Sequence, residues 1–177
     1  MKDFKHSVSV VIPNYNNAKW LKLCIESCLV QEGNFRREII VVDDHSTDKS
    51  CEILQHFQST YPEEVFIYKN PLKGGNTARN YGFTKASGDY IQWLDSDDLL
   101  LPGKLEAQIN FLEKHEEIDI AYSDWRMDFY SGESKLREEV RKEENYQSFL
   151  KNLIKDNWQP PLSYLLKRNI AEKLSQI

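Results

Sequence analysis

Short apolar runs alternate with longer segments whose apolar residues recur every three or four positions. The runs fall at 7–12, 38–42, 65–68, 90–94 and 118–122. They are rich in β-branched and aromatic residues, as strands are, whereas the segments between them have the helical period, at 18–31, around 53–57, at 77–86 and around 102–112. This alternation predicts an α/β fold with a mostly parallel central sheet and helices on both faces.

Local signals predict where some of these elements begin and end. Pro13 is expected to end the first strand, because proline cannot donate a hydrogen bond to a central ladder. Ser46 or Thr47 is expected to cap the helix that follows the second strand.

The pattern changes after residue 122. Two strand-like segments, 125–130 and 135–140, flank Ser131-Gly132-Glu133 and predict a β-hairpin. A helix over 146–154, an apolar stretch over 162–166 and a helical segment with Ala171 and Leu174 are expected to follow. Without repeats or a linker-like boundary, residues 1–177 are expected to form a single domain.

Composition excludes several classes of protein. The chain has 177 residues, 40% hydrophobic and 29% charged, with a net charge of −5, which argues against a nucleic-acid-binding surface. No apolar run reaches the roughly 18 residues of a membrane span, and residues 1–6 do not resemble a signal peptide. The expected location is the cytoplasm. Cys24, Cys28 and Cys51 are expected to be small buried side chains of helices rather than zinc ligands.

Polar segments follow four of the predicted strands. In an open parallel sheet, ligands bind outside the carboxyl ends of the strands. The segments are Asn14-Tyr15-Asn16, Asp43-Asp44, Lys73-Gly74-Gly75 and Asp95-Ser96-Asp97. We therefore expect them to converge on one edge of the sheet.

The segment Asp95-Ser96-Asp97-Asp98 is the clearest candidate for metal binding. Its three carboxylates repel one another unless a divalent cation shares their oxygens. Oxygen ligands favour Mg²⁺ or Mn²⁺, and a diphosphate could fill the remaining coordination positions. The alternative is a solvated acidic turn before the helix near Pro102, a role that suits Asp98 better than Asp95 or Asp97.

The other segments are candidates for binding a nucleotide. A carboxylate at Asp43 or Asp44 could accept the N3–H of uracil, while Tyr15 offers a ring on which the base could stack. Gly74, Gly75 and Arg79 at a helix N-terminus suit a diphosphate, although the spacing is not that of a P-loop. The alternatives are that Asp43 or Asp44 caps a helix and that Arg79 makes a surface ion pair.

Together these residues resemble the family 2 glycosyltransferases, which have the GT-A fold. Four ordered motifs carry the resemblance over residues 7–125: Val8 to Asn16, Val41 to Asp48, Gly75 to Asn80, and Asp95 to Asp98.

The resemblance implies an inverting transferase that moves a sugar from a nucleotide diphosphate, usually UDP, to an acceptor hydroxyl, as in polysaccharide biosynthesis. It implies that Pro13, Asn14 and Tyr15 frame the nucleotide, Asp44 holds the base, and Arg79 lies against the nucleotide or its phosphates. Asp95, next to Ser96, approaches the ribose or sugar and assists Asp97, the principal ligand of Mn²⁺ or Mg²⁺.

The resemblance also divides the chain. Residues 7–122 correspond to the donor-binding half and residues 123–177 to an incomplete acceptor-binding half. The catalytic base is expected beyond Ile177. The acceptor is expected to be a saccharide or a lipid-linked saccharide, which leaves peripheral association with the inner membrane face open.

Other functions predict different sequence features or behaviour. A nucleotide-sugar binding module would bind the donor without transferring the sugar. A sugar nucleotidyltransferase would have a glycine-rich loop directly after the first strand, where this chain has Asn14-Tyr15-Asn16-Asn17. Receiver-type domains also place aspartates at strand ends, but they require neither the Arg79 loop nor Asp95-Ser96-Asp97.

Overall fold

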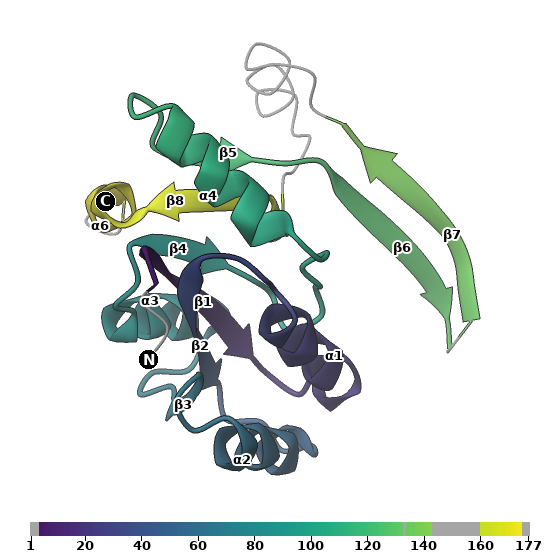
Figure 1. Cartoon of the computed structure of the whole chain (residues 1–177). Coiled ribbons are helices and arrows are strands. Elements are labelled where there is room, and N and C mark those ends of the chain that lie inside the picture. The colour runs from purple at the N-terminus through teal and green to yellow at the C-terminus, as the bar shows by residue number, and fades with distance from the viewer. Residues whose placement is uncertain (1–3, 133, 143–159, 175–177) are drawn as a thin grey trace.

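The computed structural model describes residues 4–132, 134–142 and 160–174. Its central sheet has the order β3-β2-β1-β4-β8-β5, and a separate hairpin pairs β6 with β7 (Figure 1). The strands are β1 (His6–Asn14), β2 (Phe35–Asp43), β3 (Val65–Lys69), β4 (Tyr90–Trp93), β5 (Ile120–Tyr122), β6 (Trp125–Ser131), β7 (Ser134–Arg141) and β8 (Tyr164–Lys167). The helices are α1 (Ala18–Leu29), α2 (Ser50–Thr60), α3 (Gly75–Lys85), α4 (Lys104–Lys114) and α6 (Arg168–Leu174), with a 3₁₀ turn, η1, at Pro161–Ser163. The helix expected over 146–154 lies outside the described residues.

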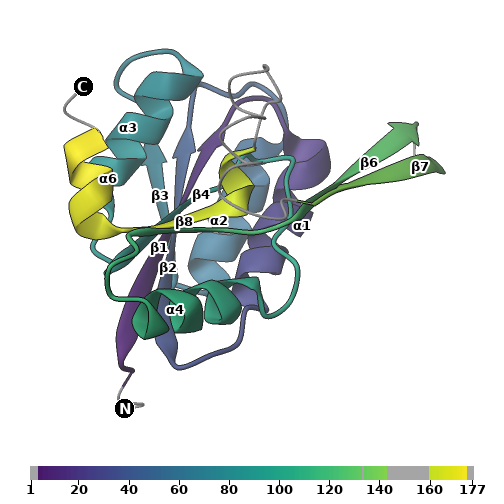
Figure 2. The same cartoon turned by 90° about the horizontal axis from the view of Figure 1, so that it is seen from above.

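The predicted α/β architecture is confirmed. Strands β3, β2, β1 and β4 are parallel, and β8 runs antiparallel between β4 and β5. Helices α1, α2 and α4 pack on one face of the sheet and α3 on the other (Figure 2). Gly82 allows α3 to pack closely against the sheet. A Cβ atom at this position would lie only 2.6 Å from Cγ1 of Val11 in β1.

The prediction that Pro13 ends the first strand is wrong. Strand β1 continues to Asn14, and Pro13 is in register with Val42 of β2. The Asn14 carbonyl accepts from Asp44 next to β2, whereas the Val11 carbonyl accepts from Leu94 on the β4 side. Since backbone groups alternate between neighbours, the nitrogen of Pro13 faces the β4 side, where pairing with β4 has already ended at Val11. The missing N–H therefore breaks no ladder bond.

Two expectations about the following helix are also wrong. Helix α2 begins at Ser50, so neither Ser46 nor Thr47 caps it. The Ser46 hydroxyl instead accepts from the side chain of Asn14 and the backbone of Asn16. Cys51 is exposed rather than buried, whereas Cys24 and Cys28 are buried as expected.

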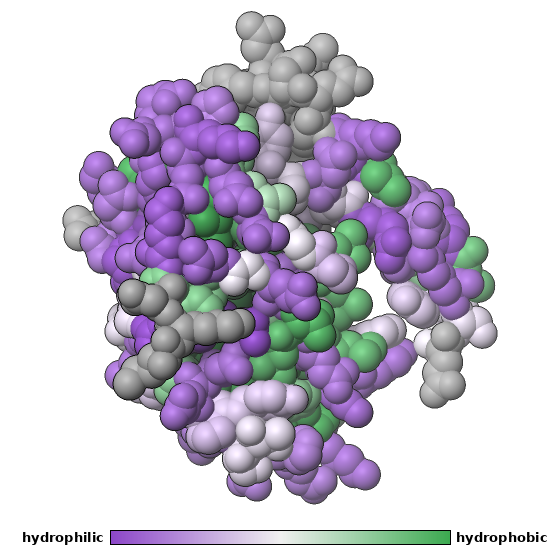
Figure 3. Space-filling model, in the orientation of Figure 1, coloured by the Kyte–Doolittle hydropathy of each residue, from purple (hydrophilic) through white to green (hydrophobic). Residues whose placement is uncertain are grey.

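The predicted hairpin is confirmed and projects from the body of the molecule (Figures 1 and 2). Figure 3 shows it as a largely hydrophilic lobe, separated along part of its length from the body. Its tip contacts α1, where the rings of Trp20 and Tyr130 lie 5.2 Å apart and Lys19 donates to the Gly132 carbonyl. Within the described ranges, no helix has the length and apolar character needed to cross a bilayer.

The half-buried carboxylate of Glu38 connects β1, β2 and the loop before β4. Glu38 of β2 accepts from the hydroxyl of Ser9 in β1, from the backbone and hydroxyl of Ser87, and from the backbone of Gly88. Burial raises the pKa of Glu38, but these hydrogen bonds outweigh burial and hold the pKa below its ordinary value. Glu38 therefore stabilises the fold above the pKa of an unfolded glutamate, and this contribution is lost as the pH falls through the folded pKa.

Glu38→Gln is expected to lower the free energy of unfolding at pH 7 by about 1–2 kcal/mol, because an amide group faces donors that the carboxylate accepted. Urea unfolding at pH 7 and pH 3 measures the difference, which should shrink at pH 3. Glu63→Gln, at an exposed position, serves as the control and should be neutral at both pH values. An equal loss at the two pH values would contradict the proposed role of the charge.

Candidate nucleotide-binding site

The structure brings all eight predicted site residues to one cavity of about 530 Å³. The cavity lies where β1, β2 and β4 end and α3 begins, which is the carboxyl edge of the parallel strands. It is lined by Pro13, Asn14, Tyr15, Asn16, Asn17, Asp44, Gly75, Arg79, Asp95, Ser96 and Asp97. The predicted convergence of the polar segments is therefore confirmed, while the role of each residue stays a prediction.

Asp44 fixes the loop that leads into α3. The residue is only 5% exposed, and its carboxylate accepts from the Gly74 backbone at 2.9 and 3.0 Å and from Nδ2 of Asn70 at 2.7 Å. A carboxylate offers about four lone-pair sites, so a ligand donor can still be accepted. Asp44 does not cap α2, which begins six residues later.

Sequence reasoning missed Asn70. Its side chain is buried and also donates to the Gly74 carbonyl and to Oγ1 of Thr77, while its Oδ1 lacks a hydrogen-bond partner. The available signal was an asparagine at the end of a strand just before Pro71, in a loop that carries ligand-binding candidates. Asn70 sets where α3 begins, and so where Arg79 lies.

Tyr15 offers a half-exposed ring at the rim of the cavity. Its exposed fraction is 51%, and Nζ of Lys73 lies 5.6 Å from the ring centroid. An exposed aromatic face beside a buried carboxylate suits a planar ring that carries an N–H group.

Arg79 and Asp95 join α3 to the loop after β4. Nη2 of Arg79 donates to Oδ1 of Asp95 at 2.6 Å, and Nη1 donates to Oδ1 of Asn76 at 3.2 Å. Ser96 is buried, and its hydroxyl accepts from Nδ2 of Asn17 just before α1. The ion pair that the alternative interpretation gave to Arg79 is therefore present, but it lies within the cavity and leaves part of the guanidinium exposed.

The loop after β4 carries an unbalanced negative charge. Burial, followed by the charges of Asp97 and Asp95, raises the pKa of Asp98 to about 7. Asp97 is exposed, and its carboxylate has no hydrogen-bond or ion-pair partner among the described residues. This arrangement favours a cation at the loop.

The donor atoms of this loop fit a hard divalent cation in part. No group of three His, Cys, Asp or Glu side chains in the described ranges could hold a metal ion. Asp97 and Asp95 offer carboxylate oxygens, and Asp95 already binds Arg79. Such a site suits Mg²⁺ or Mn²⁺ only where a ligand such as a diphosphate completes the coordination.

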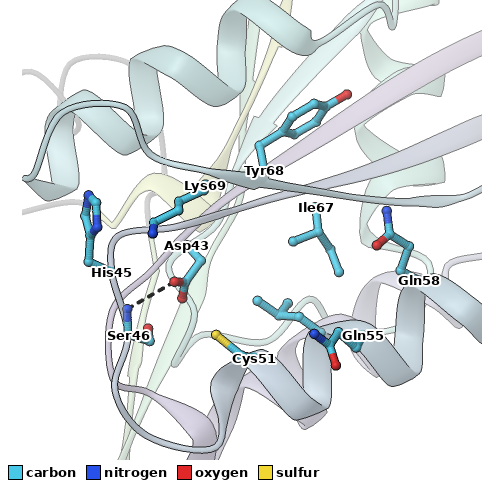
Figure 4. A pocket seen from close by; sticks show the side chains of 10 residues that line it. Asp43, His45, Ser46, Cys51, Gln55, Gln58, Ile67, Tyr68 and Lys69 are labelled. Atoms are coloured by element: carbon cyan, nitrogen blue, oxygen red, sulfur yellow. Dashed lines mark hydrogen bonds between the residues drawn. The ribbon is translucent and has the colours of Figure 1, made fainter.

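A second cavity of about 400 Å³ lies on the other side of the β2 end, between α2 and β3 (Figure 4). Asp43 separates the two cavities: its carboxylate accepts from Nδ2 of Asn14 and from the Ser46 backbone, each at 3.0 Å. Asp43 therefore braces the wall of the candidate site, and Asp44 is the carboxylate that lines it.

Known proteins resemble this chain in sequence and structure. It is 40% identical over 121 residues to the minor teichoic acid biosynthesis protein GgaB of Bacillus subtilis, covering 67% of this chain and 13% of that protein. An uncharacterized glycosyltransferase of Methanocaldococcus jannaschii is 32% identical over 171 residues, 96% of this chain and 59% of that protein. The crystal structure of residues 1–349 of S. aureus TarS aligns with a TM-score of 0.58 and 26% identity, covering 66% of this chain and 34% of that one.

The chain thus spans less than two thirds of these proteins. The model of the family described as "Glycosyl transferase family 2" matches residues 9–166, a range that contains every residue lining the candidate site. The chain therefore belongs to glycosyl transferase family 2.

Proposed function

We propose that the protein transfers a sugar from a nucleotide diphosphate donor, a UDP-sugar, to an acceptor hydroxyl with inversion and with the help of Mn²⁺ or Mg²⁺. The observation that carries the proposal is the meeting of Asp44, Arg79 and Asp97 in one cavity. Structures of TarS in complex with UDP and with UDP-GlcNAc support the choice of donor.

Each proposed role is assigned to a residue at a strand end or in helix α3. Asp44, after β2, accepts the N3–H of uracil, and the base stacks on Tyr15. Arg79 binds the diphosphate, for which the start of α3 is also suited. Pro13 and Asn14 frame the nucleotide, and Asp95 with Ser96 lies toward the ribose or sugar.

Asp97, with Asp95, would hold the divalent cation. When bound, such a cation stabilises the negative charge of the departing diphosphate. This chain's own contribution is to place the carboxylates and Arg79 around the diphosphate before the reaction. No described residue is assigned as the catalytic base.

The same proposal assigns the two parts of the chain. Residues 7–122 supply the donor-binding half, and residues 123–177 belong to the acceptor-binding half, which receives a saccharide or a lipid-linked saccharide. Such an acceptor fits a location at the cytoplasmic face of a membrane. A binding module without transfer is the second candidate, because the described cavity accounts for donor binding and the described residues include no assigned catalytic base.

Calorimetry with UDP, CDP, GDP and ADP, with and without Mn²⁺, tests the proposal. We expect metal-dependent binding that prefers UDP. Equal and metal-independent binding of all four nucleotides would refute it. Release of UDP from UDP-GlcNAc in the presence of a saccharide acceptor then separates a transferase from a binding module.

A further inference from the structure

The sheet topology places the segment around Pro160–Tyr164 at the edge of the sheet that carries the proposed donor site. Asn14 is the last residue of β1, and Asp44 and Asp95 follow β2 and β4. The strands β2, β1 and β4 are successive neighbours in the sheet, and β8 is the next strand. Since β8 is antiparallel to β4, with Ile91 opposite Leu166, the chain just before β8 lies at the end of β4 that leads into Asp95. Along this edge of the sheet, the order is therefore Asp44, which is proposed to bind the base, then Asn14, then Asp95, and then the 160–164 segment.

Side chains from β4 and α4 hold four successive carbonyl groups of this segment. Nε2 of Gln92 donates to the carbonyls of Pro161 and Leu162 at 3.2 and 3.3 Å, and also to its neighbour Trp93 at 2.6 Å. Nε2 of Gln108 donates to the Ser163 carbonyl at 2.9 Å.

Lys104, at the start of α4, completes the set. Its Nζ donates to Oε1 of Gln92 and lies 3.5 Å from the Tyr164 carbonyl. Burial lowers the pKa of Lys104 well below its ordinary value, against an opposing effect of Cys28. The carbonyls around Nε2 and the amine at Oε1 together set the orientation of the Gln92 amide, because Nε2 only donates and Oε1 only accepts.

A buried polar cluster of this kind could simply satisfy backbone groups of a packed segment. Gln92, however, is 0% exposed and stands three residues before Asp95 in a strand whose other buried residues are mostly apolar. Its amide thus links the strand that leads to Asp95 and Asp97 to the segment just before β8.

We propose that Gln92, oriented by Lys104, is a positioning residue that holds the 160–164 segment as the wall of the subsite for the donor sugar. The inference rests on the proposed function, because the sugar end of the cavity is defined by the roles given to Asp44 and Asp97. Gln92 touches neither donor nor acceptor in this proposal and acts through the wall.

Hydrogen exchange of the amides of residues 162–167, measured with UDP and with UDP-GlcNAc in the presence of Mn²⁺, tests the inference without requiring turnover. In the unmodified chain we expect UDP-GlcNAc, compared with UDP, to slow exchange in this segment about fivefold or more. Gln92→Met should abolish this sugar-dependent protection while the Kd for UDP stays within about twofold. Gln58→Met, the same chemical change on the exposed face of α2, is the matched control and should behave as the parent.

Gln92→Glu separates positioning from overall stability. It keeps an acceptor for Lys104 but lacks the N–H groups that hold the carbonyls of residues 161 and 162, so the sugar-dependent protection should again be lost in a folded protein. Protection equal to that of the parent in Gln92→Met or Gln92→Glu would overturn the positioning role. A parent chain that binds UDP but shows no sugar-dependent protection would overturn the subsite, and one that binds no UDP would overturn the proposed function and this inference with it.

Discussion

Asp97→Asn is expected to weaken the Mn²⁺-dependent binding of UDP about 100-fold, since losses of this order accompany damage to a metal's coordination shell. The carboxylate is exposed in the cavity and unpaired among the described residues, so its substitution breaks no contact that holds the fold. Asparagine keeps the size of the side chain and removes its charge. Calorimetry with and without Mn²⁺ measures the loss directly.

Asp119→Asn is the matched control, because the Asp119 carboxylate makes a 3.5 Å ion pair with Lys167 just before β5, away from the candidate site, and has no other ion pair among the described residues. It should bind UDP as the parent does in both conditions. In the absence of Mn²⁺, Asp97→Asn should bind UDP at least as well as the parent. An unchanged metal-dependent affinity in Asp97→Asn would remove Asp97 as a metal ligand.

Asp44→Ala is expected to have the second large effect, on both stability and base selectivity. Removing the carboxylate leaves the Gly74 N–H and one N–H of the Asn70 amide without their acceptor. This loss should lower the free energy of unfolding by about 3 kcal/mol. It should also remove the preference for UDP over CDP, because cytosine lacks the N3–H that Asp44 is proposed to accept. Urea unfolding and competitive calorimetry measure the two effects separately.

Asn70→Ala distinguishes the support of the loop from recognition of the base. This substitution removes the buried hydrogen bonds from the Asn70 side chain to Asp44 and Thr77 but keeps the Asp44 carboxylate. We expect a comparable loss of stability with the preference for UDP retained. If Asn70→Ala also abolished the preference, Asp44 would act through the loop and not on the base.

The convergence of the site residues in one cavity could be predicted because the ends of the strands can be recognised in the sequence. Asp44 and Asp95 each follow a buried apolar run, and the rule that parallel strands share a carboxyl edge brings them together without knowledge of the packing. The hairpin was predictable for a similar reason, since its turn lies at Gly132 between two segments with strand composition. These are properties of short stretches of chain.

Features that depend on distant partners could not be predicted. Nothing near Tyr164 indicates that β8 enters the sheet between β4 and β5. The tolerance of Pro13 within β1 depends on where the neighbouring strand stops, and the importance of Asn70 depends on a carboxylate 26 residues away. A single glutamine at Gln92 in an apolar strand looks like a local defect until the carbonyls that it binds are known.

The position of β8 also sets the order in which the sheet can be completed as the chain leaves the ribosome. Strands β1 to β4 find their partners within the first part of the chain, whereas β5 is joined to them only through residues 164–167. Until those residues have been synthesised, β5 has no strand of the central sheet beside it, and the edge of β4 is open. The later half of the sheet therefore depends on contacts of high sequence separation, which form slowly, and a nascent chain exposes an unpaired β4 edge to other chains during this interval.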